Sequence, residues 1–249
     1  MICMAKICLI NVGANSSHRK LRSALFSDGN FEFIPIPDPC LNGTRRGLRY
    51  SQLHAFSEMK ISDIISKEFE NQCAHNDPEF ETYTYGDYPT CHARAANLKR
   101  LSKGDYIFFF ARLVPWHMGK FNGKAKFAII GFIEIEKIFK DITRKPPKDE
   151  FYQIANNAHV IRGEVNSFFY DGFWVFKGSP KSMRFNRAVT FNKQLINECG
   201  IKDVKGKEIA WDNFSSELAA IGSYFRSSRL LEDARQIDLL WDKISSENY

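Results

Sequence analysis

The sequence predicts an α+β fold, a compact and partly antiparallel β-barrel with helices packed around it. Two apolar segments, 105–114 and 126–139, stand on either side of the dipeptide Asn122-Gly123, and this arrangement predicts a long β-hairpin. The regular alternation of strands and helices found in parallel sheets is missing from the sequence, as are GxGxxG and GxxxxGKS/T motifs. A doubly wound nucleotide-binding fold is therefore not expected.

Shorter elements are expected on the N-terminal side of the hairpin. Residues 6–12 form an apolar run of strand length, and the GANSSH segment after them is predicted to be a loop. Pro35 and Pro37 restrict the alternating segment 31–39 to an edge strand or an extended chain, because proline lacks the N–H that a sheet needs. The other elements expected up to residue 101 are a helical turn at 61–69, a structured loop at 77–89 and a short helix at 95–101.

The second strand of the hairpin and the segments after it complete the predicted fold. Gly131 interrupts the apolar pattern of that strand and predicts a bulge or the close approach of another backbone. Residues 143–150 predict a charged, proline-bearing connector, followed by a helical turn at 151–158 and by strands at 172–178 and 187–192. An amphipathic C-terminal helix is expected because apolar residues recur at helical spacing, namely Leu230, Ala234, Ile237, Trp241 and Ile244.

Composition excludes several classes of protein. Of the 249 residues 44% are hydrophobic and the formal net charge is +6, which excludes a disordered tail, a collagen-like repeat and a small disulfide scaffold. No segment reaches the roughly 18 apolar residues that cross a bilayer, and the apolar run at the start is too short for a signal peptide. Six cysteines without a framework spacing favour free thiols. We therefore expect a cytoplasmic protein with no membrane partner.

Several blocks of the sequence resemble known families. The pairing of LSKGDYIFFFARL with KFAIIGFIEIEKI resembles the barrel of PUA-like domains, which include the ASCH, EVE and YTH branches. More of the chain, residues 6–192, resembles the nucleotide modification associated domain family that is the third so named. The blocks that carry this resemblance are VGANSSH, FSDGNFEFIPIPD, NDPEFETYTYGD, LKRLSKGDYIFFFARL and FWVFKGSPKSMRF.

This resemblance implies a fold, a context and a division of the chain. It implies a PUA-like barrel and an association with systems that modify bases in DNA, without specifying a reaction. Residues 1–198 are expected to form the PUA-like nucleotide modification associated domain. Residues 199–249 lie beyond the resemblance and are expected to be a C-terminal helical extension packed on that domain.

The most unusual segment is HNDPEFETYTYGD, residues 75–87, which combines carboxylates with tyrosines. Carboxylates suit donors such as an exocyclic amine, sugar hydroxyls or a water to be deprotonated. The candidate catalytic residues are Asp87 or Glu81 as general base, with His92 or His75 as its partner, and the candidate base-pocket residues are Tyr83 and Tyr85. The alternative interpretation is a loop that caps helices and pairs with the excess of lysines.

Two other segments supply candidate residues for a base pocket. Asn11, Asn15 and Ser16, at the end of the first strand and in its loop, offer amides and a hydroxyl; an ordinary turn with an N-cap serine is the alternative. Trp116, in the sequence VPWHMG, is expected to stack on an extruded base, whereas the phenylalanines of the strands are expected to pack in the core. This pocket requires the stretch around Tyr85 to lie over the open end of the sheet.

The segment GSPKSMRFNR follows a predicted strand and carries hydroxyls and cations, which are the groups that hold a phosphate. The expected phosphate-binding residues are Arg94, Ser179, Lys181, Ser182 and Arg187. Solvated charge on a surface turn is the alternative. Basic residues also occur in clumps elsewhere, and they would follow a phosphate backbone if they shared one side of the fold.

The sequence does not predict a metal site. Four residues offer nitrogen or sulfur ligands: Cys73, His75, Cys91 and His92. Their spacing fits no common zinc pattern, and adjacent residues of an extended chain point apart. Asp77, Glu79 and Asp87 would hold a magnesium ion only as part of a nucleotide complex. We therefore expect neither a resident metal nor another cofactor.

Three functions are open at this point. The leading hypothesis is a module that binds nucleic acid or a nucleotide and recognises a base, modified bases included, in a DNA-modification or defence context. The alternative is an enzyme that modifies nucleotides or DNA bases with an Asp or Glu general base. The third is an interaction protein whose amphipathic C-terminal helix docks a protein partner.

Overall fold

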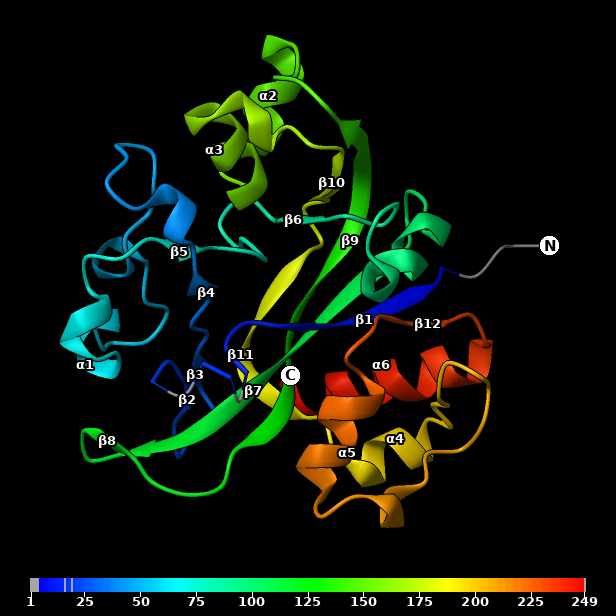
Figure 1. Cartoon of the computed structure of the whole chain (residues 1–249). Helices are drawn as coiled ribbons and strands as arrows, with labels where there is room; N and C mark the ends of the chain where they lie inside the picture. Colours follow the sequence, from blue (N-terminus) through cyan, green and yellow to red (C-terminus); the bar gives the residue numbers. More distant parts are fainter. Residues whose placement is uncertain (1–4, 16, 19, 249) are drawn as a thin grey trace.

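A long, curled β-sheet runs through the middle of the computed structural model (Figure 1), which describes residues 5–15, 17–18 and 20–248. Its strands follow the order β12-β1-β7-β9-β10-β6. Their bounds are β1 Ile7–Val12, β6 Thr84–Asp87, β7 Tyr106–His117, β9 Lys126–Ile142, β10 Phe173–Gly178 and β12 Arg229–Leu231. No strand pair among the described residues joins β12 to β6, so the predicted β-barrel takes the form of a curled half-barrel. The predicted α+β class is confirmed, whereas a likeness to PUA-like domains stays a prediction.

The hairpin of β7 and β9 forms the centre of the sheet, as its turn and its apolar strands predict. Both faces of β7 are covered, and Phe108, Phe109 and Phe110 are fully buried. The register of the hairpin shifts between Phe109 and Phe110, next to Gly131. A Cβ at Gly131 would clash with the carbonyl oxygen of Met183 in the neighbouring strand. The predicted bulge and the close backbone approach therefore both occur at this glycine.

Short strands extend the sheet and form a second, separate ladder. The remaining strands are the short β2 Ser23–Leu25, β3 Phe31–Glu32, β4 Ile36–Pro37, β5 Ala74–His75 and β8 Lys120–Phe121, and the longer β11 Met183–Thr190. β2 and β8 pair with β7, and β11 pairs with β9, while β4 pairs only with β5 among the described strands. The segment 31–39 is thus extended in two short pieces, in agreement with its prolines.

The α-helices are α1 Ile61–Ile64, α2 Lys148–Ile154, α3 Ala158–Val165, α4 Lys193–Glu198, α5 Glu217–Tyr224 and α6 Ala234–Asn248. In Figure 1, α2 and α3 lie together at one end of the curled sheet, α4, α5 and α6 gather at its lower right, and α1 lies apart on the left. The 3₁₀ helices are Pro39–Leu41, Tyr50–Gln52, Lys67–Phe69, Ala93–Arg100, Ser167–Phe169 and Trp211–Asn213. α2 contacts β10 and α3 contacts β6, whereas α5 contacts β9 and α6 contacts β11. No helix among the described residues is long and apolar enough to cross a membrane.

Helix capping explains where two predicted helices differ from the structure. The helical turn predicted at 151–158 is divided between α2 and α3, because Asn157 starts a new helix there. Its Oδ1 accepts a hydrogen bond of 3.1 Å from the backbone N–H of His159. The short helix predicted at 95–101 is the 3₁₀ helix Ala93–Arg100.

The C-terminal segment shares the main hydrophobic core. α6 is amphipathic, as predicted, and its buried residues include Ile237, Leu240 and Ile244. Leu230 belongs to β12, which pairs antiparallel with β1. Trp241 lies edge-on to the rings of Phe108 and Phe132, at 5.0 and 5.2 Å between ring centres. The residues after 198 thus add both a strand and apolar side chains to the same sheet. The described free cysteines are Cys8, Cys40, Cys73, Cys91 and Cys199.

Candidate functional site

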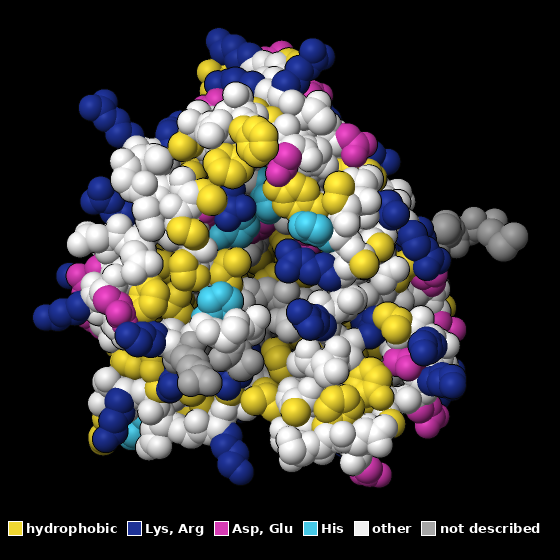
Figure 2. Space-filling model, in the orientation of Figure 1, with side chains coloured by type: hydrophobic (Ala, Val, Ile, Leu, Met, Phe, Trp, Pro, Cys, Tyr) yellow, Lys and Arg dark blue, Asp and Glu magenta, His cyan; other side chains and the backbone are white. Residues whose placement is uncertain are grey.

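A cavity of about 490 Å³ opens between the segment 33–56, the stretch 76–81, the α2–α3 junction and β11. Such a volume is typical of small-molecule sites, which span about 300–1,000 Å³. Aromatic rings and cations meet on its walls, namely Phe33, Phe56, Phe80, Arg45, Arg46 and Arg184. In Figure 2 the face of the molecule is hollowed near its centre, and histidine and basic side chains gather around the hollow.

Arg184 forms one wall of the cavity and is held between two rings. Its guanidinium carbon lies 4.1 Å from the ring centre of Phe31 and 4.0 Å from that of Phe56. One amino group donates a hydrogen bond of 2.6 Å to the Phe31 carbonyl and lies 3.7 Å from a carboxylate oxygen of Glu32. Burial lowers the pKa of Arg184 to about 10, so the side chain stays charged at neutral pH. Its buried Nε has no hydrogen-bond partner among the described residues.

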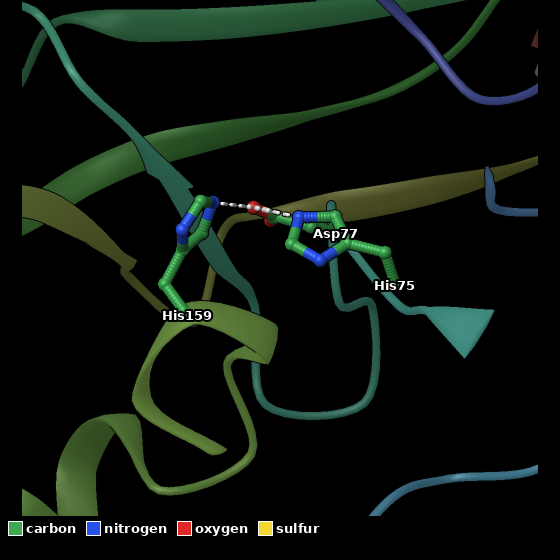
Figure 3. A group of neighbouring side chains, drawn as sticks. All are labelled: His75, Asp77 and His159. Carbon is green, nitrogen blue, oxygen red and sulfur yellow. Dashed lines mark ion pairs between the residues drawn. The ribbon is translucent and has the colours of Figure 1, made fainter. Parts of the chain in front are cut away.

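Two histidines and an aspartate meet beside the cavity (Figure 3). His75 ends β5, Asp77 follows two residues later, and His159 lies in the first turn of α3. Oδ2 of Asp77 lies 3.5 Å from Nε2 of His159 and 4.0 Å from Nε2 of His75. The three residues are buried, with 9%, 8% and 7% of their surface exposed in chain order. None of the three lines the cavity, but Asn76, between His75 and Asp77, and Ile161, in α3, do, so the group lies against the cavity wall without lining it.

Local structure explains how this group forms. Both carboxylate oxygens of Asp77 accept the backbone N–H of Gly86 in β6, at 2.9 and 3.1 Å. A Cβ at Gly86 would clash with the His159 ring and lie 2.9 Å from Oδ1 of Asn157, so glycine leaves the room that the imidazole needs. Asn157 also donates from Nδ2 to Oγ1 of Thr84 on β6, at 3.4 Å. β6 and the start of α3 together fix the positions of Asp77 and His159.

A second carboxylate orients His75. Oδ2 of Asp38 lies 3.0 Å from Nδ1 of His75 and accepts a hydrogen bond of 2.7 Å from Nε of Arg162. Burial alone would raise the pKa of Asp38, but the hydrogen bonds from His75 and Arg162 outweigh it and hold the pKa below its usual value. Asp38 is therefore ionised, and its hydrogen bond places the proton of His75 on Nδ1. Nε2 of His75 consequently presents its lone pair on the side of Asp77.

Burial sets the charge of the three clustered side chains. It lowers the pKa of His159 to about 4 and also lowers the pKa of His75, so both imidazoles are neutral at neutral pH. Burial raises the pKa of Asp77 well above its usual value. In the part of the chain that the structure describes, no lysine or arginine lies within 4 Å of the Asp77 carboxylate. Two neutral imidazoles and a carboxyl group without a cationic partner are a ligand set that suits a metal ion.

The predicted general base Asp87 ends β6 and has other partners. Its oxygens accept hydrogen bonds from the Tyr85 hydroxyl at 2.9 Å and from the Tyr88 backbone N–H at 2.8 Å. The guanidinium group of Arg94 lies 3.9 Å away. His92, the predicted partner of Asp87, is exposed and packs beside the ring of Tyr88. A catalytic role of Asp87 and His92 stays a prediction.

The predicted base-pocket residues lie at separate places in the fold. Asn11 is on β1, and Asn15 is exposed in the loop after it, where its Oδ1 accepts a hydrogen bond of 2.9 Å from the backbone of Ser17. Ser16 lies outside the described residues. Trp116 belongs to β7 and not to a loop, because β8 folds back and pairs with this end of the strand. The indole is 9% exposed, which leaves little of its surface for a base.

The acidic and aromatic parts of the stretch around Tyr85 have different surroundings. Tyr85 is buried, with its ring centre 5.2 Å from that of Phe109 in the sheet, and Tyr83 packs half-buried against the same core. Glu81 is exposed and lines the cavity. Of the described residues predicted to be catalytic, base-binding or phosphate-binding, Glu81 alone lines the cavity; Glu79, from the magnesium set, lines it as well. The tyrosines therefore contact the sheet, while Glu81 faces the cavity.

Three predicted phosphate-binding residues meet around one carboxylate of β9. Ser179 Oγ and Lys181 Nζ donate to the Glu134 side chain, the latter at 3.1 Å. Ser182 Oγ accepts the backbone N–H of Glu134 at 3.1 Å. The hydrogen bond from Ser179 is the main reason why the pKa of Glu134 lies below its usual value. Arg187 lies elsewhere on β11. Phosphate binding by this segment stays a prediction.

Sequence reasoning missed part of the clustered group. Residues two apart in an extended chain point to the same side, so the His-x-Asp spacing of His75 and Asp77 was an available signal. No spacing could reveal His159, Arg162 or Asp38, because the first two come from α3 and the third follows β4. Pairing of β4 with β5 brings Asp38 next to His75.

Comparison with known proteins identifies the family. Residues 6–198 match the family described as Nucleotide modification associated domain 3. This range contains the whole cavity and the clustered residues Asp38, His75, Asp77 and His159. No curated protein and no solved structure has significant similarity to the chain. The chain belongs to the Nucleotide modification associated domain 3 family, and its role is associated with nucleotide modification.

Proposed function

We propose that the chain binds a nucleotide, free or as a unit of a nucleic-acid strand, in the cavity beside His75, Asp77 and His159 and recognises its base there. The observation that carries the proposal is the combination of aromatic rings with guanidinium groups on the cavity walls. These groups match the two parts of a nucleotide, an aromatic base and an anionic phosphate. The family supplies the nucleotide context.

Phe56 and Phe33 supply the surface for a base, while Phe80, which is 7% exposed, packs against Phe33. Phe56 is 47% exposed although its side chain is large and apolar, so its ring is available to a ligand. Phe33 and Phe80 pack edge to face with their ring centres 6.3 Å apart, which holds both rings in place. Stacking of a base on one such ring is worth about 1–3 kcal/mol.

Arg45 and Arg184 are the cations that we assign to the phosphate. Arg45 is exposed at the cavity and forms no ion pair within the described part of the chain. Nε of Arg184 is a buried donor that no described residue satisfies. Arg46, by contrast, already lies 3.4 Å from a carboxylate oxygen of Glu164. Guanidinium groups suit phosphate because they offer several N–H donors in one plane.

Glu81 is the acid that we assign to base recognition. Its side chain is exposed at the cavity, whereas the buried Glu79 accepts hydrogen bonds from the backbone of Glu81 and from Thr82. A free carboxylate accepts a hydrogen bond from an exocyclic amino group. Glu81 therefore favours bases that carry an amino group.

Isothermal titration calorimetry with nucleoside monophosphates and with short single-stranded oligonucleotides tests the proposal. Phe56→Ala is expected to weaken the affinity by about 5-fold to 100-fold, which corresponds to the loss of one stacked base. Phe168→Ala is the matched control, because Phe168 is 82% exposed and lies outside the cavity. Absence of binding by the folded wild type at low salt, or an equal loss in both variants, contradicts the proposal.

A second pair of variants locates the phosphate. Arg45→Ala is expected to weaken nucleotide binding several-fold and to reduce its salt dependence, because one cation is lost. Lys181→Ala is expected to change the affinity little, because Lys181 already pairs with Glu134 at 3.1 Å. The opposite order of effects would assign the phosphate to the turn that contains Ser179, Lys181 and Ser182.

An enzyme of base or nucleotide modification is the second candidate, and the buried pair of Asp87 and Tyr85 is the observation that favours it. Asp87 is 7% exposed and bonded to a tyrosine hydroxyl, an environment in which carboxyl groups act in proton transfer. In this alternative Asp87 or Glu81 removes a proton from the nucleotide or from a water. Asp87→Asn is expected to abolish turnover, followed by mass spectrometry of the nucleotides, while the binding affinity is kept. Turnover that survives this substitution excludes Asp87 as the base.

A further inference from the structure

We infer that Nε2 of His75, Oδ2 of Asp77 and Nε2 of His159 bind a divalent transition-metal ion of the Zn²⁺ or Fe²⁺ type at the cavity wall. One ligand atom from each residue lies within 4.8 Å of the other two. Ligands of one tetrahedral ion with bonds of about 2.1 Å lie about 3.4 Å apart. The 3.5 Å between Asp77 and His159 matches this spacing. His75 lies 4.0 Å from Asp77, and all three ligand atoms lie within 4.8 Å of one another, so His75 has to move closer when an ion binds.

Two of the three ligands are held by a further hydrogen bond, as is usual for metal-binding side chains, whereas Nδ1 of His159 has no partner in the described chain. Nδ1 of His75 bonds to Asp38 at 3.0 Å, which leaves Nε2 for a metal. A backbone N–H of β6 holds the carboxylate of Asp77. The ring of His159 stacks on Phe173 with 5.4 Å between ring centres, and its Nε2 is turned toward Asp77 (Figure 3). The three ligand atoms are thus oriented toward one another before any ion binds.

The charges of the group also point to a cation. Asp77 is a buried carboxyl group with no lysine or arginine within 4 Å in the described chain. Asp38, close by, has such a partner in Arg162. Burial of a carboxylate is unfavourable unless a cation or several donors compensate for it. A divalent ion would supply the positive charge that Asp77 lacks, and neutral imidazole is the form that binds a metal.

This ligand set differs from the sets that the sequence suggests. His75 belongs to the Cys-His set and Asp77 to the magnesium set, but Cys91 and His92 are exposed, and Cys73 donates from its thiol to the Leu41 carbonyl at 3.2 Å. The third ligand comes from α3 instead. Three protein ligands leave at least one coordination position for water or a bound group, which is typical of catalytic and not of structural zinc sites.

The metal site stands on these contacts and does not rest on nucleotide binding. If both proposals hold, the ion lies close to the cavity but outside its lining, since Asn76 and Ile161 line the cavity and the three ligands do not. The two proposals can fail separately. Phe56→Ala is expected to keep full metal binding, whereas substitution of a metal ligand is expected to remove it.

Titration of the full chain with Co²⁺ and Zn²⁺, after a chelator has removed metal, tests the inference. We expect one equivalent of Co²⁺ with d–d absorption bands and without sulfur-to-cobalt charge transfer, because the ligand set has no thiolate. Asp77→Asn and His159→Ala are expected to lower the Co²⁺ affinity more than about 100-fold. Loss of a residue that only supports a ligand typically lowers it about 10-fold to 100-fold. His117→Ala is the control, since this histidine is exposed at the end of β7.

Failure of the folded wild type to bind either ion overturns the inference, as does wild-type affinity in both ligand variants. A thermal measurement needs no variant and covers the case in which a substitution prevents folding. Zn²⁺ is expected to raise the Tm of the wild type, because a ligand that binds the folded state stabilises it. An unchanged Tm at saturating Zn²⁺ contradicts the inference.

Discussion

Glu134 in β9 and Asp77 beside β6 are both carboxyl groups among polar side chains, yet their surroundings differ in kind. Glu134 accepts hydrogen bonds from Ser179 and Lys181, and these bonds hold its pKa below the usual value. Asp77 accepts the N–H of Gly86 and otherwise faces two neutral imidazoles, and burial raises its pKa well above the usual value. Donors of the chain thus saturate the oxygens of Glu134. The oxygens of Asp77, in contrast, can still accept a hydrogen bond or bind a cation.

The difference shows how a structural polar cluster can be separated from a candidate site. In a structural cluster the chain supplies both the donors and the acceptors. In the candidate site Asp77 lies beside two imidazoles, and no lysine or arginine of the described chain lies within 4 Å of its carboxylate, so the chain supplies no cation there. The balance of donors and acceptors, more than the density of polar residues, therefore distinguishes the two regions.

The largest effect is expected from Gly86→Ala. The added Cβ would clash with the ring of His159 and lie 2.9 Å from Oδ1 of Asn157, and both groups are packed. We expect loss of Co²⁺ binding, because the His159 ring has to leave its position. We also expect the free energy of unfolding to fall by about 1–3 kcal/mol. Co²⁺ titration and urea unfolding measure the two effects.

Gly222→Ala is the matched control for this glycine. The nearest atoms to its added Cβ belong to Phe127 and lie at 3.9 Å, and the residue is inside α5. Alanine there should keep Co²⁺ binding and increase the stability slightly, because alanine favours helix over glycine. Full metal binding by Gly86→Ala would show that the position of His159 does not matter for the ion.

Asp38→Asn should have an intermediate effect. The amide loses the charge that holds the Nδ1 proton of His75, so the imidazole becomes a weaker and less well oriented ligand. We expect the Co²⁺ affinity to fall about 10-fold to 100-fold, with one ion still bound at saturation. Glu134→Gln makes the same change of carboxylate to amide at the saturated group and should leave the affinity unchanged. Equal losses of Co²⁺ affinity in the two variants would contradict the distinction between the candidate site and the structural cluster around Glu134.

Local patterns were sufficient for the centre of the fold. The β7–β9 hairpin follows from two apolar strands around a turn, and Gly131 marks the bulge. β12 is three residues long and forms only because β1 offers it an edge, so its own sequence carries little strand signal. The half-barrel could not be distinguished from a closed barrel, because closure depends on which distant strands pair.

The site was predicted less well, because the sequence shows what a residue can bond but not what it already bonds. Ser179 and Lys181 have the chemistry of a phosphate site, yet their hydrogen bonds go to Glu134 in another strand. His75 and Asp77 stand in one segment, and the distant α3 turns them into a converging group by adding His159. In both cases the contacts that define the role of a residue come from residues far away in the sequence, which no local pattern predicts.

The smallest effect is expected at the saturated carboxylate, from Glu134→Gln. The hydrogen bonds from Ser179 and Lys181 hold the pKa of Glu134 below its value in the unfolded chain. A depressed pKa means that the carboxylate stabilises the fold at neutral pH and that this contribution is lost as the pH falls through the folded pKa. Glu134→Gln should therefore lower the free energy of unfolding modestly at neutral pH, and its difference from the wild type should shrink once the pH falls below the ordinary glutamate pKa of about 4.3. Urea unfolding over a pH series measures this difference. A constant difference across the series would mean that packing and not charge holds Glu134, and the contrast with Asp77 would then have to rest on geometry alone.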